Sequence, residues 1–184
     1  LCNVSSTMIF ADGGRPGEIF LSGGAGARYL ALGGSGVATN RVDGFSPYYN
    51  SGALGLIERK EIATLHSILW EETSYSYLAY VHPIYSGGCL GVEFARLYSG
   101  GAIKTDENNN VTGDFYNQQI SMGVGYGKTV TEKLSAGFKM KFFNNFLDQV
   151  SASNFIVDGG AIYRANESLS LGVALQNLIA MNLN

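Results

Sequence analysis

The sequence predicts an all-β protein, an antiparallel transmembrane β-barrel that begins with a glycine-rich N-terminal segment. Several stretches alternate apolar with polar or very small residues at a period of two, the pattern of a strand with one apolar face. Glycine (25), tyrosine (11) and phenylalanine (10) are frequent, whereas charged residues make up only 15% of the chain. No run of about 18 apolar residues could cross a bilayer as a helix. If this chain crosses a membrane, it does so with β-strands, which need only one apolar face.

The first 57 residues divide into two parts. Residues 1–11 (LCNVSSTMIFA) resemble the end of a secretory signal peptide, and Cys2 leaves a lipoprotein site open as an alternative. Residues 12–57 are glycine-rich and apolar as far as Ala38 and then rich in turn residues. A short helix is expected at Ser51–Leu56.

Residues 58–184 are predicted to form strand after strand. The clearest is Leu134–Phe142, in which every second residue is apolar and the residues between are Ser, Gly and Lys. About seven strands are expected, each near the roughly 9–11 residues that cross a bilayer when tilted. They are Ile62–Trp70, Tyr75–His82, Leu90–Ala95, Ile120–Gly127, Leu134–Phe142, Asn154–Tyr163 and Leu169–Gln176.

The connections between these strands alternate between short and longer, as in barrels with tight periplasmic turns and long outward loops. Ser99–Asp114 is predicted to be a long polar outward loop, and Asn144–Ser151 an intermediate one. Short connections are expected at Glu71–Ser74, Pro83–Gly87, Lys128–Lys133 and Ala165–Ser168.

The alternation alone also fits a soluble antiparallel β-domain, which would bury its apolar face. Two features favour the membrane: the polar faces consist mainly of Gly, Ser, Ala and isolated charges, and tyrosines and Trp70 lie near the turns, as in an interfacial belt. An unpaired strand edge cannot face lipid, and bacterial barrels usually have an even number of strands from about 8 upward. We therefore expect the chain to hold the first part of a barrel, with further strands after Asn184.

Four charged residues fall on the predicted inner faces of the strands: Glu93, Lys139, Lys141 and Asp158. An inside position is expected because a Lys or Arg facing lipid at mid-membrane costs about 2–4 kcal/mol. The first interpretation is a set of structural ion pairs, which Arg164 at a strand end would join. The second is a ligand-binding site in which Lys139 and Lys141, beside Glu93, contact an anionic head group such as a carboxylate.

Other chemistries find little support in the sequence. The net charge is −3 and no basic cluster is present, so nucleic acid is not an expected partner. The two cysteines and two histidines show no metal-ligand or catalytic spacing. The run Gly123–Thr129 fails as a phosphate-binding loop, because Met122 stands where that motif requires glycine. We expect no enzyme activity, no catalytic residue, no metal and no cofactor.

A family resemblance rests mainly on two runs in the N-terminal segment. GAGARYLALGGSGVA (Gly24–Ala38) is followed by DGFSPYYNSGALGL (Asp43–Leu56). Together they resemble the N-terminal signature of the FadL-like outer-membrane β-barrel superfamily, and they are most similar to its PorV branch. The match is imperfect, since Tyr49 and Ser51 replace the Trp and Pro of that pattern. The later runs DGGAIY (Asp158–Tyr163) and LGVALQNL (Leu171–Leu178) are similar to the family's strand-turn-strand pattern.

The resemblance implies a barrel of about fourteen strands in the bacterial outer membrane, with residues 12–57 folded into the lumen as a hatch. Arg28, Asp43 and Asn50 would belong to that hatch, and Arg28 and Asp43 could pair with the barrel wall. The expected partners are outer-membrane lipid and a hydrophobic small molecule that the barrel transports or binds. The alternative is an accessory of protein secretion that docks secreted proteins. A soluble β-domain remains the third and weakest reading.

Overall fold

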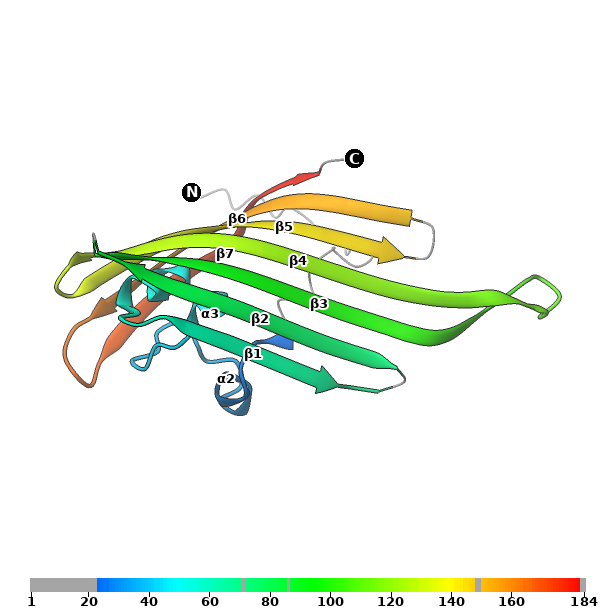
Figure 1. Ribbon diagram of the computed structural model, residues 1–184, viewed down its shortest axis with the longest axis horizontal. Helices are drawn as coiled ribbons and strands as arrows, with labels where there is room; N and C mark the ends of the chain where they lie inside the picture. Colours follow the sequence, from blue (N-terminus) through cyan, green and yellow to red (C-terminus); the bar gives the residue numbers. More distant parts are fainter. Residues whose placement is uncertain (1–22, 71, 86, 148–149, 183–184) are drawn as a thin grey trace, which may run out of the picture.

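One antiparallel sheet makes up most of the molecule, and the N-terminal segment packs on one of its faces (Figure 1). The computed structural model describes residues 23–70, 72–85, 87–147 and 150–182. The expected signal-peptide remnant at residues 1–11, Cys2 and the beginning of the expected hatch lie outside the described residues. Among the described residues, no helix is long and apolar enough to span a membrane.

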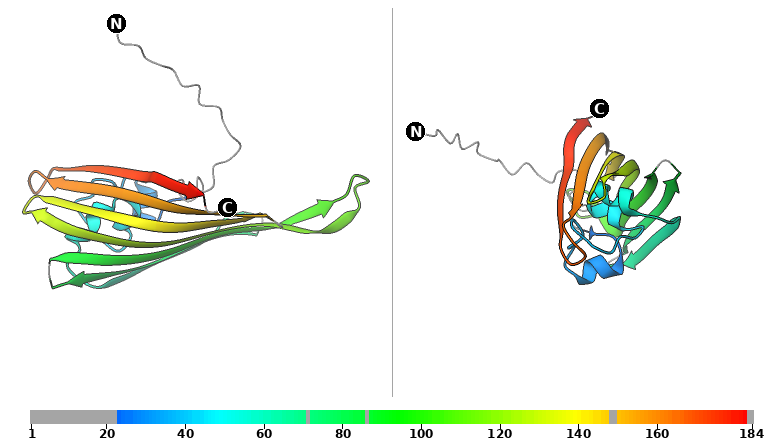
Figure 2. Two further views of the ribbon diagram at one scale, coloured as in Figure 1. Left: turned by 90° about the horizontal axis from the view of Figure 1, so that it is seen from above. Right: turned by 90° about the vertical axis from the view of Figure 1, so that its left-hand side faces the viewer.

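The sheet has seven strands in sequence order, each antiparallel to the one before it. They are β1 (Glu61–Ile68), β2 (Thr73–Ile84), β3 (Gly88–Thr105), β4 (Val111–Thr131), β5 (Leu134–Leu147), β6 (Val150–Arg164) and β7 (Ser170–Asn182). This confirms the all-β class and the seven predicted strands. The sheet curls, so that the N-terminal segment lies in its concave side (Figure 2). Within the described residues the outer edges of β1 and β7 pair with no further strand.

Most strands are longer than the alternation predicted, and two predicted loops are wrong. The expected long loop Ser99–Asp114 is mostly strand, because β3 and β4 continue as a paired ribbon beyond a bulge after Ser99 and leave only residues 106–110 as the turn. Most of the expected loop Asn144–Ser151 likewise belongs to β5 and β6. Polar residues and glycines suggested loops there, yet ladder hydrogen bonds to a neighbouring strand hold the backbone extended.

Between residues 24 and 57 the structure describes α2 (Ala27–Ala31), α3 (Ser46–Tyr49) and the 3-10 helix η1 (Ser51–Leu56), all of them short. The predicted helix at Ser51–Leu56 is confirmed. It begins at Asn50, whose Oδ1 accepts a hydrogen bond from the backbone N–H of Gly52 at 2.9 Å and so satisfies one free donor at the helix start. The segment's contacts with β4, β5 and β6 place η1 against the middle of the sheet.

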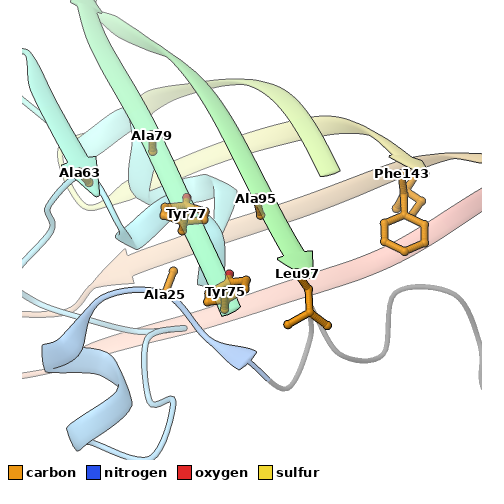
Figure 3. Packing of buried hydrophobic residues seen from close by; sticks show 9 residues of the cluster. Ala25, Ala63, Tyr75, Tyr77, Ala79, Ala95, Leu97 and Phe143 are labelled. Atoms are coloured by element: carbon orange, nitrogen blue, oxygen red, sulfur yellow. The ribbon is translucent and has the colours of Figure 1, made fainter. Parts of the chain in front are cut away.

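The two faces of the sheet differ in chemistry. On the convex face, large apolar side chains are exposed over β2 to β7. They include Leu78, Val92, Met122, Val124, Phe138, Met140, Phe142, Leu171, Val173 and Leu175. The concave face holds the buried residues, among them glycines, charged residues and a packed cluster to which Tyr75, Tyr77 and Phe143 belong (Figure 3). The concave face is not polar throughout, since Ile156 and Ile162 are buried there.

Candidate functional site

The charged residues of the concave face form one cluster, named here the ion cluster: Glu93, Lys139, Lys141 and Asp158. Strand alternation brings them together, since each of these positions points to the concave side of β3, β5 or β6. Lys139 and Asp158 are direct partners in the register of β5 and β6. The cluster contains two cations and two carboxylates, so its formal charges balance.

Lys139 is the centre of the ion cluster. Its Nζ lies 2.9 Å from Glu93 Oε1 and 3.9 Å from Asp158 Oδ2, and only 5% of its side chain is exposed. The same Nζ donates a hydrogen bond to the carbonyl oxygen of Pro47 at 3.1 Å and lies 5.9 Å from the ring centroid of Tyr48. Lys139 therefore joins the sheet to the N-terminal segment as well as to two carboxylates.

Lys141, the second lysine of the ion cluster, pairs with the carboxylate of Asp158. Lys141 Nζ lies 2.8 Å from Asp158 Oδ2, and 14% of its side chain is exposed. The other carboxylate oxygen, Asp158 Oδ1, accepts a hydrogen bond from the backbone N–H of Asn177 at 2.9 Å. Asn177 has a positive φ of 57° next to an irregularity in the β6–β7 pairing, which turns its N–H toward the carboxylate. This irregularity lets β7 contribute to the ion cluster.

Two glycines of β4 make room for the ion cluster. Gly123 pairs with both Glu93 and Lys141, and Gly125 pairs with Lys139, so β4 lies between the carboxylate of β3 and the lysines of β5. A Cβ at Gly123 would lie 2.8 Å from Cγ of Glu93. A side chain there would occupy the space in which Glu93 reaches Lys139. These glycines therefore need no role in phosphate binding. Their lack of a side chain allows close packing inside the sheet.

A small cavity of about 40 Å³ adjoins the ion cluster. Its lining includes the polar residues Lys141, Gln176 and Asn177 and the apolar residues Phe143 and Ile156. The cavity has room for a few water molecules, each of which needs polar partners of the kind that line it. The site can thus hold a polar group next to an apolar surface.

Asn50 of the N-terminal segment bonds two strands of the sheet. Its Nδ2 faces three carbonyl oxygens, those of Val37 at 2.7 Å, Ala161 at 3.1 Å and Val173 at 3.2 Å. These belong to the segment itself, to β6 and to β7. The side chain is 1% exposed, so the bonds are shielded from water.

Hydroxyl groups continue this attachment along η1. Ser51 Oγ donates to the carbonyl oxygen of Gly137 at 2.9 Å, Ser135 Oγ donates to that of Gly52 at 2.7 Å, and Thr129 Oγ1 donates to that of Gly55 at 2.6 Å. The sheet backbone comes this close because its facing residues are glycine: a Cβ at Gly137, Gly160 or Gly172 would collide with the N-terminal segment. η1 is therefore fixed to β4 and β5: Ser51 donates to the backbone of β5, and side chains of β4 and β5 donate to the backbone of η1.

Within the described residues, the hydrogen bonds of Arg28 and Asp43 stay inside the N-terminal segment, so their pairing with the barrel wall stays a prediction. Arg28 is exposed and donates to the carbonyl oxygen of Arg41 at 3.1 Å. Asp43 Oδ1 accepts from the N–H of Phe45 at 3.0 Å and from the hydroxyl of Tyr29 at 3.2 Å. Both residues stabilise the fold of the segment itself. Asn50, the third expected hatch residue, does reach the sheet.

Arg164 lies at the end of β6, as the sequence indicated, but its contacts are not with the other charged residues. Its Nη2 donates to the carbonyl oxygen of Asn40 at 3.4 Å, and the side chain of Asn40 accepts a short hydrogen bond from Ser170 Oγ. These contacts attach the segment to the turn end of β6 and β7. Arg164 is therefore not a member of the ion cluster.

Tyrosine hydroxyls of the N-terminal segment are buried in its interior. Tyr49 OH bonds both backbone groups of Ala25, donating to the carbonyl oxygen at 2.9 Å and accepting from the N–H at 3.0 Å. Tyr29 OH lies 2.7 Å from Ser46 Oγ. Burial raises the pKa of the Tyr29 and Tyr49 hydroxyls above 10.0, with a further contribution from the charge of Asp43.

Sequence reasoning found the four charged residues of the ion cluster but missed their neutral partners. Tyr77 OH donates to Glu93 Oε2 at 3.1 Å, and Tyr48 and Asn177 contact the lysines or Asp158. Tyr77 alternates with Ser76 and Leu78 in a strand whose faces the sequence did not distinguish. The bulge that presents Asn177 has no sequence signal, since one inserted residue cannot be told from a shifted register.

No metal-binding group of three or more His, Cys, Asp or Glu side chains is present within the described ranges 23–70, 72–85, 87–147 and 150–182. The ion cluster can bind and position a polar group. Its cations already have carboxylate partners, and the lining of the adjoining cavity includes apolar residues. Comparisons with protein-family models, with curated proteins and with solved structures found no match for this chain.

Proposed function

We propose that this chain is part of a bacterial outer-membrane β-barrel of the FadL/PorV-like type, which binds or transports hydrophobic small molecules. One observation carries the proposal: the face of the sheet away from the N-terminal segment is apolar, while the face toward it holds the charges. A soluble sheet would have the opposite arrangement, with its apolar face buried. Lipid is the solvent that suits an apolar exposed face.

The extent of the convex apolar surface supports this proposal. Met122 is 53% exposed, Val124 54% and Val173 63%, and they belong to the central strand β4 and the edge strand β7. Soluble monomers rarely expose contiguous apolar patches of more than a few hundred Å². Within a bilayer the same residues contact acyl chains. The proposal also requires other strands to pair with the edges of β1 and β7, since an unpaired edge cannot face lipid.

The N-terminal segment acts as the hatch in this proposal. Asn50 and η1 are hydrogen-bonded to the backbone of the strands, so the hatch is anchored along β5 to β7. Lys139 completes the anchor through the carbonyl oxygen of Pro47. Lys141 is the more accessible lysine and lines the cavity beside Phe143 and Ile156. It is the residue that we assign to the polar end of a mostly hydrophobic ligand.

A role as an accessory of protein secretion is the second candidate, and the β3–β4 ribbon favours it. This hairpin extends well beyond the neighbouring strands (Figure 2). Its tip, residues 106–110, carries Asp106 and Glu107 with three asparagines. A long polar projection offers a binding surface to a protein, whereas a small hydrophobic ligand would not bind to it.

The deciding experiment is mass spectrometry of the full-length protein, purified gently from outer-membrane fractions. Co-purifying apolar small molecules that decrease in Lys141→Gln but not in Lys133→Gln would support binding or transport. Lys133 lies in the exposed β4–β5 turn, so it controls for the loss of a positive charge. Enriched secreted proteins without a small ligand would favour the secretion role. Recovery of the protein only from soluble fractions would overturn the membrane proposal.

A further inference from the structure

A series of polar side chains marks one border of the convex apolar surface. On β2, β3, β5 and β6, the apolar residues Leu78, Phe94, Phe142 and Phe155 are each followed, two positions nearer the loops, by an outward polar residue. These residues are Ser76, Arg96, Asn144 and Ser153. Each bonds a neighbour on the adjacent strand: His66 with Ser76 at 3.0 Å, Arg96 with Gln118 at 2.8 Å, and Asn144 with Ser153 at 2.7 Å.

The apolar run that ends at this border has the length of a bilayer crossing. On β4 the outward polar residues Lys128 and Gln118 are ten residues apart. The outward residues between them are apolar. At about 3.3 Å per residue they span roughly 33 Å along the strand. A tilt of about 40° reduces this to roughly 25 Å of height, the thickness of the apolar band on outer-membrane barrels. Gln118 and its partner Arg96 therefore lie at the level of the lipid head groups.

Arg96 is fixed in place yet keeps donors free. Its Nε and Nη2 donate to Gln118 Oε1 at 3.2 and 2.8 Å, and its guanidinium lies 5.1 Å from the ring centroid of Tyr98. The side chain is exposed on the convex face, and no carboxylate of the described residues lies within ion-pair distance. A guanidinium held in one orientation at the edge of an apolar surface suits a phosphate oxygen.

We propose that Arg96, oriented by Gln118 and Tyr98, binds the phosphate of an anionic lipid head group in the leaflet on the hairpin side of the membrane. The inference rests on the proposed membrane location and adds a specific lipid site to it. The acyl chains of that lipid lie along the apolar residues of β3 and β4 below Arg96, among them Phe94 and Met122. The phosphate neutralises a charge that has no carboxylate partner within the described part of the protein.

The test measures lipid binding to the full-length protein in detergent by native mass spectrometry. Short-chain phosphatidylglycerol is titrated, with short-chain phosphatidylcholine and inorganic phosphate as competing probes. Arg96→Gln is compared with Arg59→Gln, a matched control because Arg59 is an exposed arginine already paired with Glu61 at 2.9 Å. Arg96→Lys asks whether the held planar guanidinium is needed or charge alone suffices. A separate flotation assay with phosphatidylcholine vesicles containing phosphatidylglycerol establishes membrane binding.

We expect Arg96→Gln to weaken phosphatidylglycerol binding by about tenfold, the effect of losing one charge-assisted contact of about 1.4 kcal/mol. Arg59→Gln should leave it unchanged, and Arg96→Lys should retain part of it. Equal losses in Arg96→Gln and Arg59→Gln, or full competition by inorganic phosphate, would overturn the lipid site. If the protein floats with the vesicles in that case, the membrane proposal stands. If it does not float, both proposals fail.

Discussion

Glu93 and Lys139 form a 2.9 Å ion pair across β4, the strand that lies between them, at a point where that strand carries only a glycine hydrogen as its inward side chain. The pair is nearly buried, with 10% of the Glu93 side chain and 5% of the Lys139 side chain exposed. Its formation therefore depends on Gly123 as much as on the two charged residues. This dependence connects the glycine content of the sequence to the structure of the ion cluster.

Replacing Gly123 should break the ion pair without touching either charge. A Cβ at this position lies 2.8 Å from Glu93 Cγ and 2.9 Å from Glu93 Oε1, so Gly123→Val must displace the carboxylate. We expect a loss of about 3 kcal/mol in the free energy of unfolding, since Lys139 then loses its closest partner in a buried site. Urea unfolding measures this loss. Gly159→Ala is the control, because its Cβ meets only Leu178 at an ordinary 3.6 Å.

Removing the charge of Lys139 should destabilise the protein more than removing the whole pair. Lys139→Met leaves Glu93 buried without a cation and is expected to cost about 3–5 kcal/mol. Adding Glu93→Gln removes that unpaired charge, so the double variant should recover part of the loss. A double-mutant cycle in urea unfolding measures the coupling. Additive losses would show that the two side chains act independently, contrary to this account.

The donor of Asn50 should prove essential for attaching the N-terminal segment. Asn50→Asp keeps the oxygen that caps η1 but removes the NH2 group that faces the carbonyls of Ala161 and Val173. We expect a loss of about 2–3 kcal/mol, because buried carbonyls lose their donor and face a carboxylate instead. Faster proteolysis within residues 23–57 is the readout. Asn166→Asp should change nothing, since the side chain of Asn166 bonds other described residues through Oδ1, which accepts from the N–H groups of Ser168 and Leu169.

The tyrosines of the N-terminal segment predict a loss of stability at high pH. Tyr29 and Tyr49 have pKa values raised above 10.0, mainly by burial, so the fold favours their neutral forms. Their contribution to stability is complete below pH 10.0 and decreases as the pH rises through the raised values. Ultraviolet absorbance measures the formation of tyrosinate as the pH rises, and proteolysis measures the accompanying loss of structure in the segment. In Tyr49→Phe the alkaline transition should become smaller; an unchanged transition would assign it to other groups.

The strands of the sheet could be predicted from sequence wherever one face is apolar and the other is small or polar. In Leu134–Phe142 the alternation fixed both the strand and its inward lysines, and the ion pairs of Lys139 and Lys141 follow from that assignment. Strand ends were not predictable in this way. The ribbon beyond Ser99 is polar and glycine-rich, and only its pairing with β4 shows that it is extended.

Contacts between the N-terminal segment and the sheet could not be predicted, because they depend on backbone atoms that no side-chain pattern encodes. Asn50 binds carbonyl groups of residues more than 100 positions away in the sequence. Arg28 and Asp43 had the charges for such a role, yet they fold the segment locally instead. A charged residue in the sequence indicates that a polar partner is needed. Which residue becomes that partner depends on the three-dimensional structure.

The β3–β4 ribbon should be removable without loss of the fold, and its removal separates the two proposed functions. β2 pairs with β3 only as far as Ser99, and β5 pairs with β4 only from Asn117. Beyond that pair the ribbon is two-stranded, and such ribbons contribute little stability of their own. Residues 100–116 can be replaced by Asn-Gly, a turn suited to a two-residue hairpin between the paired residues Ser99 and Asn117.

We expect this shortened protein to unfold in urea within about 0.5 kcal/mol of the parent, as for changes away from packed contacts. Mass spectrometry of what co-purifies with it then distinguishes the functions. A hydrophobic ligand should be retained, because Lys141 and the cavity beside Phe143 lie in the part of the sheet that remains. Loss of co-purifying secreted proteins, with an intact fold, would instead assign the ribbon to protein docking and favour the secretion role.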